Sequence, residues 1–352
     1  MRLEKLFKAK MERRRVLGNL GMMGAGAVMT ACGTSAMGNG GDDGDDMADA
    51  NLDAAILNFA LNLEYLEAAF YLAVVGRLTE LPNYDAAKII LPEGYDGTNP
   101  DNSLYPAVGP VSDAIAEYAQ EIAQDELDHV EFLVNALGMD AASLPTINLD
   151  ASFKAAAAAA SSLTANGFPF AAEDFDPFAN GAFFLHGAFI FEDVGVTAYK
   201  GAARYLSNPD FLEAAAGILA VEAYHAGLVR TFLYAADKRR NDAFDGLDTW
   251  TIVRAISDAR DSLDQGNADS NTDLDQGIVG NSELDTLVHE GDNDLGANIV
   301  PTDANGIAFS RTPVQVANVV YLSADTVPGG FFPNGISVPT GLEAEFETLL
   351  SL

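Results

Sequence analysis

Apolar residues recur every three or four positions in four long segments of the chain, and turn residues separate these segments. Such spacing is typical of amphipathic helices that pack on a common core. The break at Ser207-Asn208-Pro209 between the third and fourth segments is short, so these two helices should form an antiparallel hairpin. The pattern therefore predicts an all-α protein whose centre, residues 52–240, is a four-helix bundle. The predicted helices cover residues 52–76, 111–137, 178–206 and 209–238.

Two long insertions separate the first three helices. The segment 77–110 is rich in Pro, Gly, Asn and Tyr and is longer than a usual loop, so we expect it to pack over one end of the bundle. The segment 138–177 is long enough to carry the chain across the bundle from the second helix to the third. Gly76 and Gly138 are the predicted stops of the first two helices.

The composition changes after the fourth helix, where Asp, Asn and Gly become frequent and helical spacing persists only in short pieces such as 250–263. Thr312 and Gln315 have the spacing of a capping box, with Pro313 at the first helical position, so a helix should begin there. The apolar residues of this part need a core that buries them. We therefore predict that residues 241–352 form an irregular C-terminal extension packed on the bundle, with a separate domain as the alternative.

Residues 1–31 have the features of a bacterial export signal. Basic residues, among them Arg13 and Arg14, precede a mildly apolar stretch, and the arginine pair resembles the twin-arginine type, with a Sec signal as the alternative. Cys32 ends a Met-Thr-Ala-Cys sequence that resembles a lipobox, where bacteria attach a lipid. Residues 32–51 are rich in Gly and Asp, which is typical of a flexible acidic tether. The chain is therefore predicted to be exported to the periplasm or cell envelope, with lipid anchoring as an option.

The charge of the chain limits its partners. It carries 52 acidic and 19 basic residues, for a formal net charge of −33. A nucleic-acid backbone or an anionic lipid surface would repel it, so no nucleic acid is expected and a lipid at Cys32 is the only expected membrane attachment. Hydrophobic residues make up 49% of the chain, which is enough for a globular core. No oligomeric state follows from these features.

Two glutamates lie within otherwise apolar helical segments. Glu64 follows Leu63 in the first helix, and Glu192 follows Phe191 in the third. Burying a carboxylate costs several kcal/mol unless a cation or a hydrogen-bond donor compensates for the lost water. Metal coordination is the energetically less costly explanation for an acid in such a segment.

The second and fourth helices each contain a Glu-x-x-His sequence. Because residues three apart share a helix face, the glutamate and the histidine of each sequence can bind the same cation. One glutamate from each of two helices, with Glu-x-x-His from each of the other two, is the ligand set of di-iron and di-manganese carboxylate bundles. The predicted metal ligands are Glu64, Glu126, His129, Glu192, Glu222 and His225.

Each predicted ligand has an expected role. Glu126 and Glu222 are the expected bridging carboxylates and the candidate catalytic residues, while Glu64 and Glu192 are the expected terminal ligands. The histidines would supply one nitrogen to each metal. Carboxylates with one imidazole per metal suit iron or manganese better than copper, so two Fe ions, or alternatively two Mn ions, are the expected cofactors, with zinc as an adventitious occupant. The competing interpretation places these acids on solvated helix faces.

Five other residues either lie close in sequence to the predicted ligands or are histidines outside the Glu-x-x-His sequences. Glu67 is a surface residue, a partner of a ligand or an extra ligand, in that order of expectation. Tyr71 and Tyr199 each follow a predicted ligand by seven residues, so they either line the site or, as is more common, pack in the core. His186 does not share the ligand face of its helix, and His289 lies in an acidic segment, so neither is a predicted ligand.

Several stretches of the chain resemble the ferritin-like superfamily. The resemblance is closest to the branch that includes plant and bacterial desiccation-related proteins, while rubrerythrin and bacterioferritin are more distant. It implies the same six ligands and oxygen or peroxide chemistry at a dinuclear centre. The similar stretches are LEYLEAAFY (63–71), DELDHVEFL (125–133), FEDVGVTAYKGAA (191–203), GILAVEAYHAGLVR (217–230), NIVPTDANGIAFSRT (298–312) and GGFFPNG (329–335).

Three functions are compatible with these features. The leading hypothesis is an exported di-iron oxidase or peroxidase that uses O2 or H2O2 and protects against oxidative or desiccation stress. A di-manganese catalase is the nearest enzymatic alternative, because that chemistry uses a similar Glu and His set. A non-catalytic envelope or stress protein with a structural metal site is the alternative from another class.

Overall fold

The computed structural model describes residues 43–99, 109–264, 274–279 and 296–352. The predicted export signal, Cys32 with its lipobox, and His289 lie outside the described residues.

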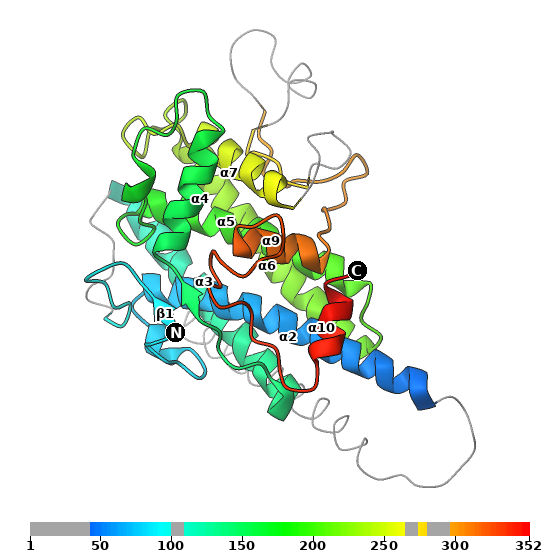
Figure 1. Cartoon of the computed structure of the whole chain (residues 1–352). Helices are drawn as coiled ribbons and strands as arrows, with labels where there is room; N and C mark the ends of the chain where they lie inside the picture. The colour runs from blue at the N-terminus through cyan, green and yellow to red at the C-terminus, as the bar shows by residue number, and fades with distance from the viewer. Residues whose placement is uncertain (1–42, 100–108, 265–273, 280–295) are drawn as a thin grey trace, which may run out of the picture.

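Four long helices form the centre of the molecule, and the predicted all-α fold is confirmed. Helices α2 and α3 pack against each other, as do α5 and α6, so the bundle consists of two helical hairpins (Figure 1). Helix α2 begins before residue 52, so residues 43–51 of the predicted tether are helical. Asp is favoured in the first turn of a helix as well as in tethers, and composition alone does not separate the two. The bounds are α2 Asp43–Val74, α3 Gly109–Leu137, α5 Gly181–Ala203 and α6 Pro209–Ala236.

Local sequence sets the ends of these helices. Gly76 and Gly138 have φ angles of 74° and 61°, the left-handed conformation that ends a helix, as predicted. The Asn208 side chain caps α6 by accepting a hydrogen bond from the backbone of Asp210. Buried Asp53 on α2 accepts hydrogen bonds from Ser207 and Asn208, and so ties the α5–α6 connection to the first helix.

The two insertions pair with each other. Strand β1 (Ile89–Ile90) in the first insertion runs parallel to β2 (Ile147–Asn148) in the second, with Ile89 opposite Ile147. The second insertion also contains the helix α4 (Ala151–Ser162), an Ala-rich segment of high helix propensity. The sequence pattern did not predict the strands or α4. Short 3-10 turns complete the insertions at Leu78–Glu80, Gly138–Asp140 and Ala172–Asp174.

The C-terminal extension lies along the bundle and adds three further described helices (Figure 1). Helix α7 (Thr249–Leu263) packs on α4, α9 (Pro313–Tyr321) packs on α5, and α10 (Glu343–Leu349) packs on α2. Helix α9 begins with the predicted capping box, in which the Thr312 and Gln315 side chains each accept a hydrogen bond from the other residue's backbone.

An aromatic cluster joins the bundle, the second insertion and the extension in one core. Phe191 on α5 lies with its ring centroid 5.5 Å from that of Phe70 on α2 and 5.5 Å from that of Phe153 on α4. Phe331 of the extension completes the cluster at 4.9 Å from Phe191. These rings are almost fully buried, so the extension contributes directly to the core of the bundle.

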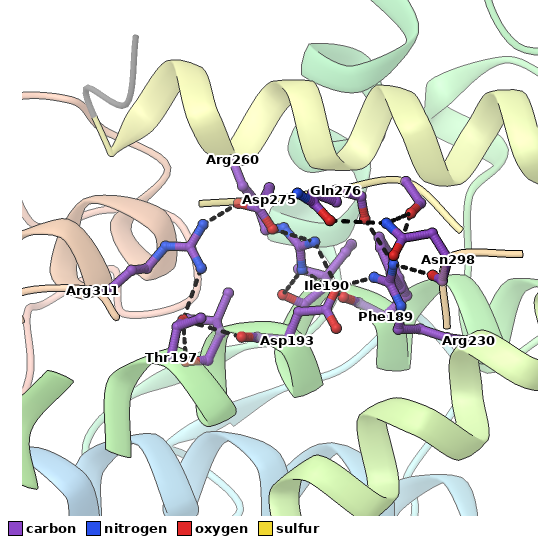
Figure 2. Close-up of polar contacts among 12 residues, drawn as sticks. Phe189, Ile190, Asp193, Thr197, Arg230, Arg260, Asp275, Gln276, Asn298 and Arg311 are labelled. Atoms are coloured by element: carbon purple, nitrogen blue, oxygen red, sulfur yellow. Dashed lines mark hydrogen bonds and ion pairs between the residues drawn. The ribbon is translucent and has the colours of Figure 1, made fainter. Parts of the chain in front are cut away.

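A buried ion-pair network also holds the extension against α5 (Figure 2). Arg230 on α6 and Arg260 on α7 both donate to Oδ2 of Asp193 on α5, at 2.8 and 3.1 Å. Arg311 donates to Asp264 at 2.9 Å and also contacts Asp275. All of these side chains are buried, and unpaired charges there would be costly. The network therefore makes α7 and the segment before α9 part of the packed protein.

Among the described helices, only α6 is long and apolar enough to cross a membrane by length and composition. Its Glu222, His225 and Arg230 side chains are buried inside the protein, which is typical of a core helix in a bundle.

Candidate metal centre

The structure brings all six predicted ligand residues together in the middle of the bundle. Helix α2 supplies Glu64, and α5 supplies Glu192. Each of these helices belongs to a different hairpin, and its partner α3 or α6 supplies a Glu-x-x-His pair. All six side chains are buried, so the interpretation as solvated helix faces is wrong.

The ligand atoms fall into two groups, each compact enough to hold one metal ion. One group contains Glu64, Glu126, His129 and Glu222, and the other contains Glu126, Glu192 and His225, with the atoms of each group within 4.8 Å of one another. Glu126 belongs to both groups, as a bridging carboxylate must. Glu222 belongs only to the first.

Both histidines turn the same ring nitrogen towards the carboxylates. His129 Nδ1 lies 3.2 Å from Glu64 Oε2 and 3.3 Å from Glu126 Oε2. His225 Nδ1 lies 3.0 Å from Glu126 Oε1 and 3.6 Å from Glu192 Oε2. Each histidine thus faces one expected terminal carboxylate and the carboxylate that the two groups share.

A carboxylate outside the predicted set orients one of these rings. The other nitrogen of His225, Nε2, lies 3.4 Å from Oδ2 of Asp125. Such a contact fixes the ring and its tautomer, and it is the usual partner of a metal-binding histidine. Sequence reasoning missed Asp125, although its position directly before Glu126 was a usable signal.

Several oxygen and nitrogen atoms of the six ligand residues form no hydrogen bond within the described structure. They are Glu126 Oε1, Glu192 Oε2, both carboxylate oxygens of Glu222, and His225 Nδ1. Apart from ion-pair contacts with the histidines, such as that of His225 Nδ1 with Glu126 Oε1, these atoms lack the hydrogen bonds that buried polar atoms normally form. These are the oxygen and nitrogen atoms that iron, manganese or zinc would bind, so the residues present fit a metal site.

Three of the four ligand carboxylates resist ionisation because burial removes them from bulk water. Burial raises the pKa of Glu64 to about 7 and the pKa of Glu192 to about 8. Burial, together with the neighbouring carboxylates, raises the pKa of Glu222 well above its ordinary value. Divalent cations would compensate for this crowding of acidic groups.

The histidines and the shared carboxylate instead favour their charged forms. Burial opposes the charged form of Glu126, but His129 and His225 outweigh it and hold the pKa of Glu126 below its ordinary value. Burial also opposes the charged histidines, yet the surrounding carboxylates raise the pKa of His129 to about 11 and the pKa of His225 to about 10. Without a metal, protons on the histidines would supply the positive charge that the cluster needs.

Two tyrosines connect the hairpins across the cluster. The Tyr71 hydroxyl on α2 donates to Glu192 Oε1 on α5, and the Tyr199 hydroxyl on α5 donates to Glu64 Oε1 on α2. Both tyrosines therefore line the site. Their spacing placed them on the ligand face, but it did not predict that each would bond to the carboxylate of the opposite hairpin.

Glu67 and Gly195 make the two halves of the cluster unequal. Glu67 is buried, so the expectation that it is a surface residue is wrong. Burial, together with the nearby Glu126, raises the pKa of Glu67 well above its ordinary value. A Cβ atom at Gly195 would lie 2.1 Å from Glu222 Oε2 and 3.4 Å from Glu67 Oε1. Glycine thus makes room for the Glu222 carboxylate, while Glu67 borders the same space at ordinary contact distance. Sequence reasoning missed Gly195, for which a glycine inside a helix was the only signal.

His186 lies apart from both ligand groups, as predicted. Its Nδ1 donates to the Ala182 carbonyl at 2.7 Å, while its Nε2 has no hydrogen-bond partner within the described structure. Burial lowers the pKa of His186 to about 4, so the ring is neutral at pH 7.

A helical bundle with a buried cluster of glutamates and histidines defines a class of protein, the carboxylate four-helix bundles. Within that class the chain belongs to the ferritin-like family, because the model of the ferritin-like domain matches residues 52–235. This match confirms the resemblance found in the sequence and covers all four bundle helices that carry the cluster.

Two relatives match most of the chain. The desiccation-related protein PCC13-62 of Craterostigma plantagineum is 28% identical over 293 residues, which cover 82% of this chain and 83% of that protein. The ferritin-like catalase Nec2 of Nesocodon mauritianus is 25% identical over 293 residues, which cover 80% of this chain and 83% of that protein. No solved structure shows a significant match to the chain.

Proposed function

We propose that the cluster binds two metal ions, with iron as the leading candidate, and that the centre reduces O2 or H2O2. The observation that carries this proposal is that buried glutamate and histidine atoms of the two ligand groups form no hydrogen bond within the described structure. Glu126 and Glu222 are the proposed bridging ligands, and support for that role is stronger for Glu126, which belongs to both ligand groups.

The bound metals would supply the electrons for the reduction, and the protein supplies the surroundings. The tyrosines hold Glu64 and Glu192 in place through their hydroxyl groups, because each hydroxyl bonds one oxygen and leaves the other for coordination. Asp125 orients His225 from the opposite side of the ring. The apolar core around the cluster keeps bulk water away from the reacting groups.

The identity of the metal is the first point to test. Elemental analysis of protein isolated from its own cell envelope should find close to two Fe ions per chain. After anaerobic titration with Fe(II), exposure to O2 or H2O2 should then oxidise the bound Fe(II) faster than the same oxidant oxidises Fe(II) in buffer. Protein that binds neither Fe(II) nor Mn(II) would contradict the proposal.

A di-manganese catalase-like enzyme is the second candidate function. It is favoured by the relative named as a ferritin-like catalase, which shares the fold family and 25% of aligned residues with this chain. The two candidates differ in their reactions, because a catalase releases O2 from H2O2, whereas the proposed iron centre reduces O2 or H2O2. Release of O2 from H2O2 by the Mn(II)-loaded protein, without such release by the iron form, would favour the catalase.

A non-catalytic stress or envelope protein remains the third candidate, and the relative named as desiccation-related favours a stress role. In this case the metal would stabilise the bundle without turning over a substrate. Protein that gains thermal stability from metal but consumes neither O2 nor H2O2 would support this candidate.

We also propose that the protein acts outside the cytoplasm, on the evidence of Arg13, Arg14 and Cys32 in the sequence. Replacing both arginines by lysine should leave precursor in the cytoplasm if the twin-arginine pathway is used. Fatty-acid labelling that disappears in Cys32→Ser would establish the lipid anchor, and normal export of the lysine variant would favour the Sec route.

A further inference from the structure

Two small cavities lie between the bundle and the C-terminal extension. The inner cavity, of about 20 Å³, lies between α2, α5 and α9, with Phe331 in its wall. The outer cavity, of about 30 Å³, lies further along the same helices, where Leu349 of α10 also lines it. Both walls are almost entirely apolar.

The inner cavity reaches the carboxylate cluster. Its polar lining consists of Glu67 and Tyr199, and Gly195 lies beside them. The Tyr199 hydroxyl donates to Glu64, and Gly195 borders Oε2 of Glu222. A molecule in this cavity is therefore separated from the predicted metal ligands by no more than one layer of side chains.

The outer cavity adjoins the inner one. Leu63 and Tyr199 line both cavities, so these two side chains form the partition between them. Passage from one cavity to the other therefore requires one of these side chains to move. The half-buried residues Ala60, Ala202 and Ala203 also line the outer cavity, so it reaches less buried parts of α2 and α5.

The opposite side of the cluster is polar. The Asp125 side chain, which contacts His225, is 26% exposed, and the His129 side chain is 10% exposed. Ions and hydrogen-bonding molecules meet carboxylate and imidazole groups on this side. The cluster thus has one polar side and one apolar side.

We propose that the two cavities bind O2 and form its path to the metal centre, with α9 of the C-terminal extension as one wall. A small apolar cavity stays dry and takes up apolar molecules, and a volume above about 10–15 Å³ holds one molecule the size of water. H2O2 would lose its hydrogen bonds to water there, so it uses the polar side instead. This inference rests on the proposed function and deepens it by assigning separate paths to the two oxidants.

The first experiment tests binding without turnover. Full-length protein with methyl-labelled Val and Leu is loaded with redox-inactive Zn(II) and studied by NMR under N2 and under pressurised O2. Because O2 is paramagnetic, the methyl groups of Leu63, Val316 and Val320 should relax faster under O2. The methyl groups of Val130, which is fully buried on α3 away from both linings, serve as the control. Equal effects at the cavity and at Val130 would overturn the proposal.

The second experiment changes the width of the outer cavity through substitutions of Val316 on α9. In the series Ala, Val, Leu and Phe at this position, the rate of oxidation of the Fe(II)-loaded protein by O2 should fall several-fold as the side chain grows. The rate with H2O2 should stay constant. The same substitutions at Val314, a half-buried residue of α9 that lines neither cavity, should change neither rate. The Leu variant is the mildest and guards against a Phe variant that fails to fold.

The possible outcomes separate this inference from the proposed function. O2 rates that do not depend on residue 316, or O2 and H2O2 rates that fall together, would overturn the O2 path. If the iron-loaded protein reacts with neither oxidant, the proposed function fails, and the NMR measurement alone decides whether the cavities bind O2.

Discussion

The hydrogen that Gly195 carries in place of a side chain leaves the space that Oε2 of Glu222 occupies, since a Cβ atom at this position would lie only 2.1 Å from that oxygen. The two residues lie on neighbouring helices, α5 and α6. One glycine on α5 therefore decides whether a ligand carboxylate from α6 can enter the cluster.

Gly195→Ala should therefore displace Glu222 and lower the metal content of the protein. We expect a destabilisation of about 1–3 kcal/mol from overpacking, together with fewer than two metals per chain by elemental analysis. Gly217→Ala is the matched control, because nothing lies within 4 Å of a Cβ at that position on α6. That control should retain its metal and gain about 0.5–1 kcal/mol, the helix preference of alanine over glycine. Full metal content in Gly195→Ala would contradict the proposed role of Glu222.

Glu126→Gln should lose metal more completely than His129→Ala. Glu126 belongs to both ligand groups, whereas His129 belongs to one. We expect little or no bound metal in the first variant and partial occupancy in the second, both measured by elemental analysis after equilibration with Fe(II) under anaerobic conditions. Equal metal loss in the two variants would show that Glu126 does not bridge.

Tyr71→Phe and Tyr199→Phe should each weaken metal binding by roughly 10–100-fold, the usual effect of removing a group that orients a ligand. Each change deletes only the hydroxyl that bonds Glu192 or Glu64. Competition with a chelator measures the affinity. Tyr118→Phe, whose ring packs on Phe232 with centroids 5.2 Å apart, is the control and should bind metal like the unaltered protein.

His186 should make the protein less stable in mild acid. Burial lowers its pKa from 6.5 to about 4, so the unfolded chain binds a proton between these values while the folded chain does not. The contribution of neutral His186 to the free energy of unfolding is therefore fully present above pH 6.5. It is lost as the pH falls towards 4, by up to about 3 kcal/mol. His186→Leu should lose less stability over this range in urea unfolding. Parallel pH profiles for the two proteins would rule out this explanation.

Arg311→Met should destabilise the protein by about 3–5 kcal/mol, because it leaves the buried carboxylates of Asp264 and Asp275 without that partner. Arg77→Met is the control. Arg77 pairs with Glu80 near the surface, where the two side chains are 21% and 47% exposed, and such a pair contributes at most about 1 kcal/mol. Urea midpoints that shift equally in the two variants would mean that the network contributes no more than a surface pair.

The sequence predicted those parts of the molecule that depend on local spacing. The Glu-x-x-His pairs follow from the helical period alone, and the α9 capping box follows from Thr312 and Gln315. Contacts between distant segments could not be predicted in this way. The pairing of Ile89 with Ile147 and the contact of Gly195 with Glu222 depend on how separate elements pack, and no local pattern encodes that packing.

The network in Figure 2 also bears on how the chain is divided. The change in composition after residue 240 suggests a domain boundary, but Arg230 donates to backbone carbonyls of Gln276, Gly277 and Asn298 beyond it. A bundle cut off at residue 240 would expose Phe191 and leave Arg230 without those acceptors. We therefore expect the bundle and the extension to unfold as one cooperative unit, so a denaturant curve should show one transition in which the metal site and the C-terminal helices are lost together.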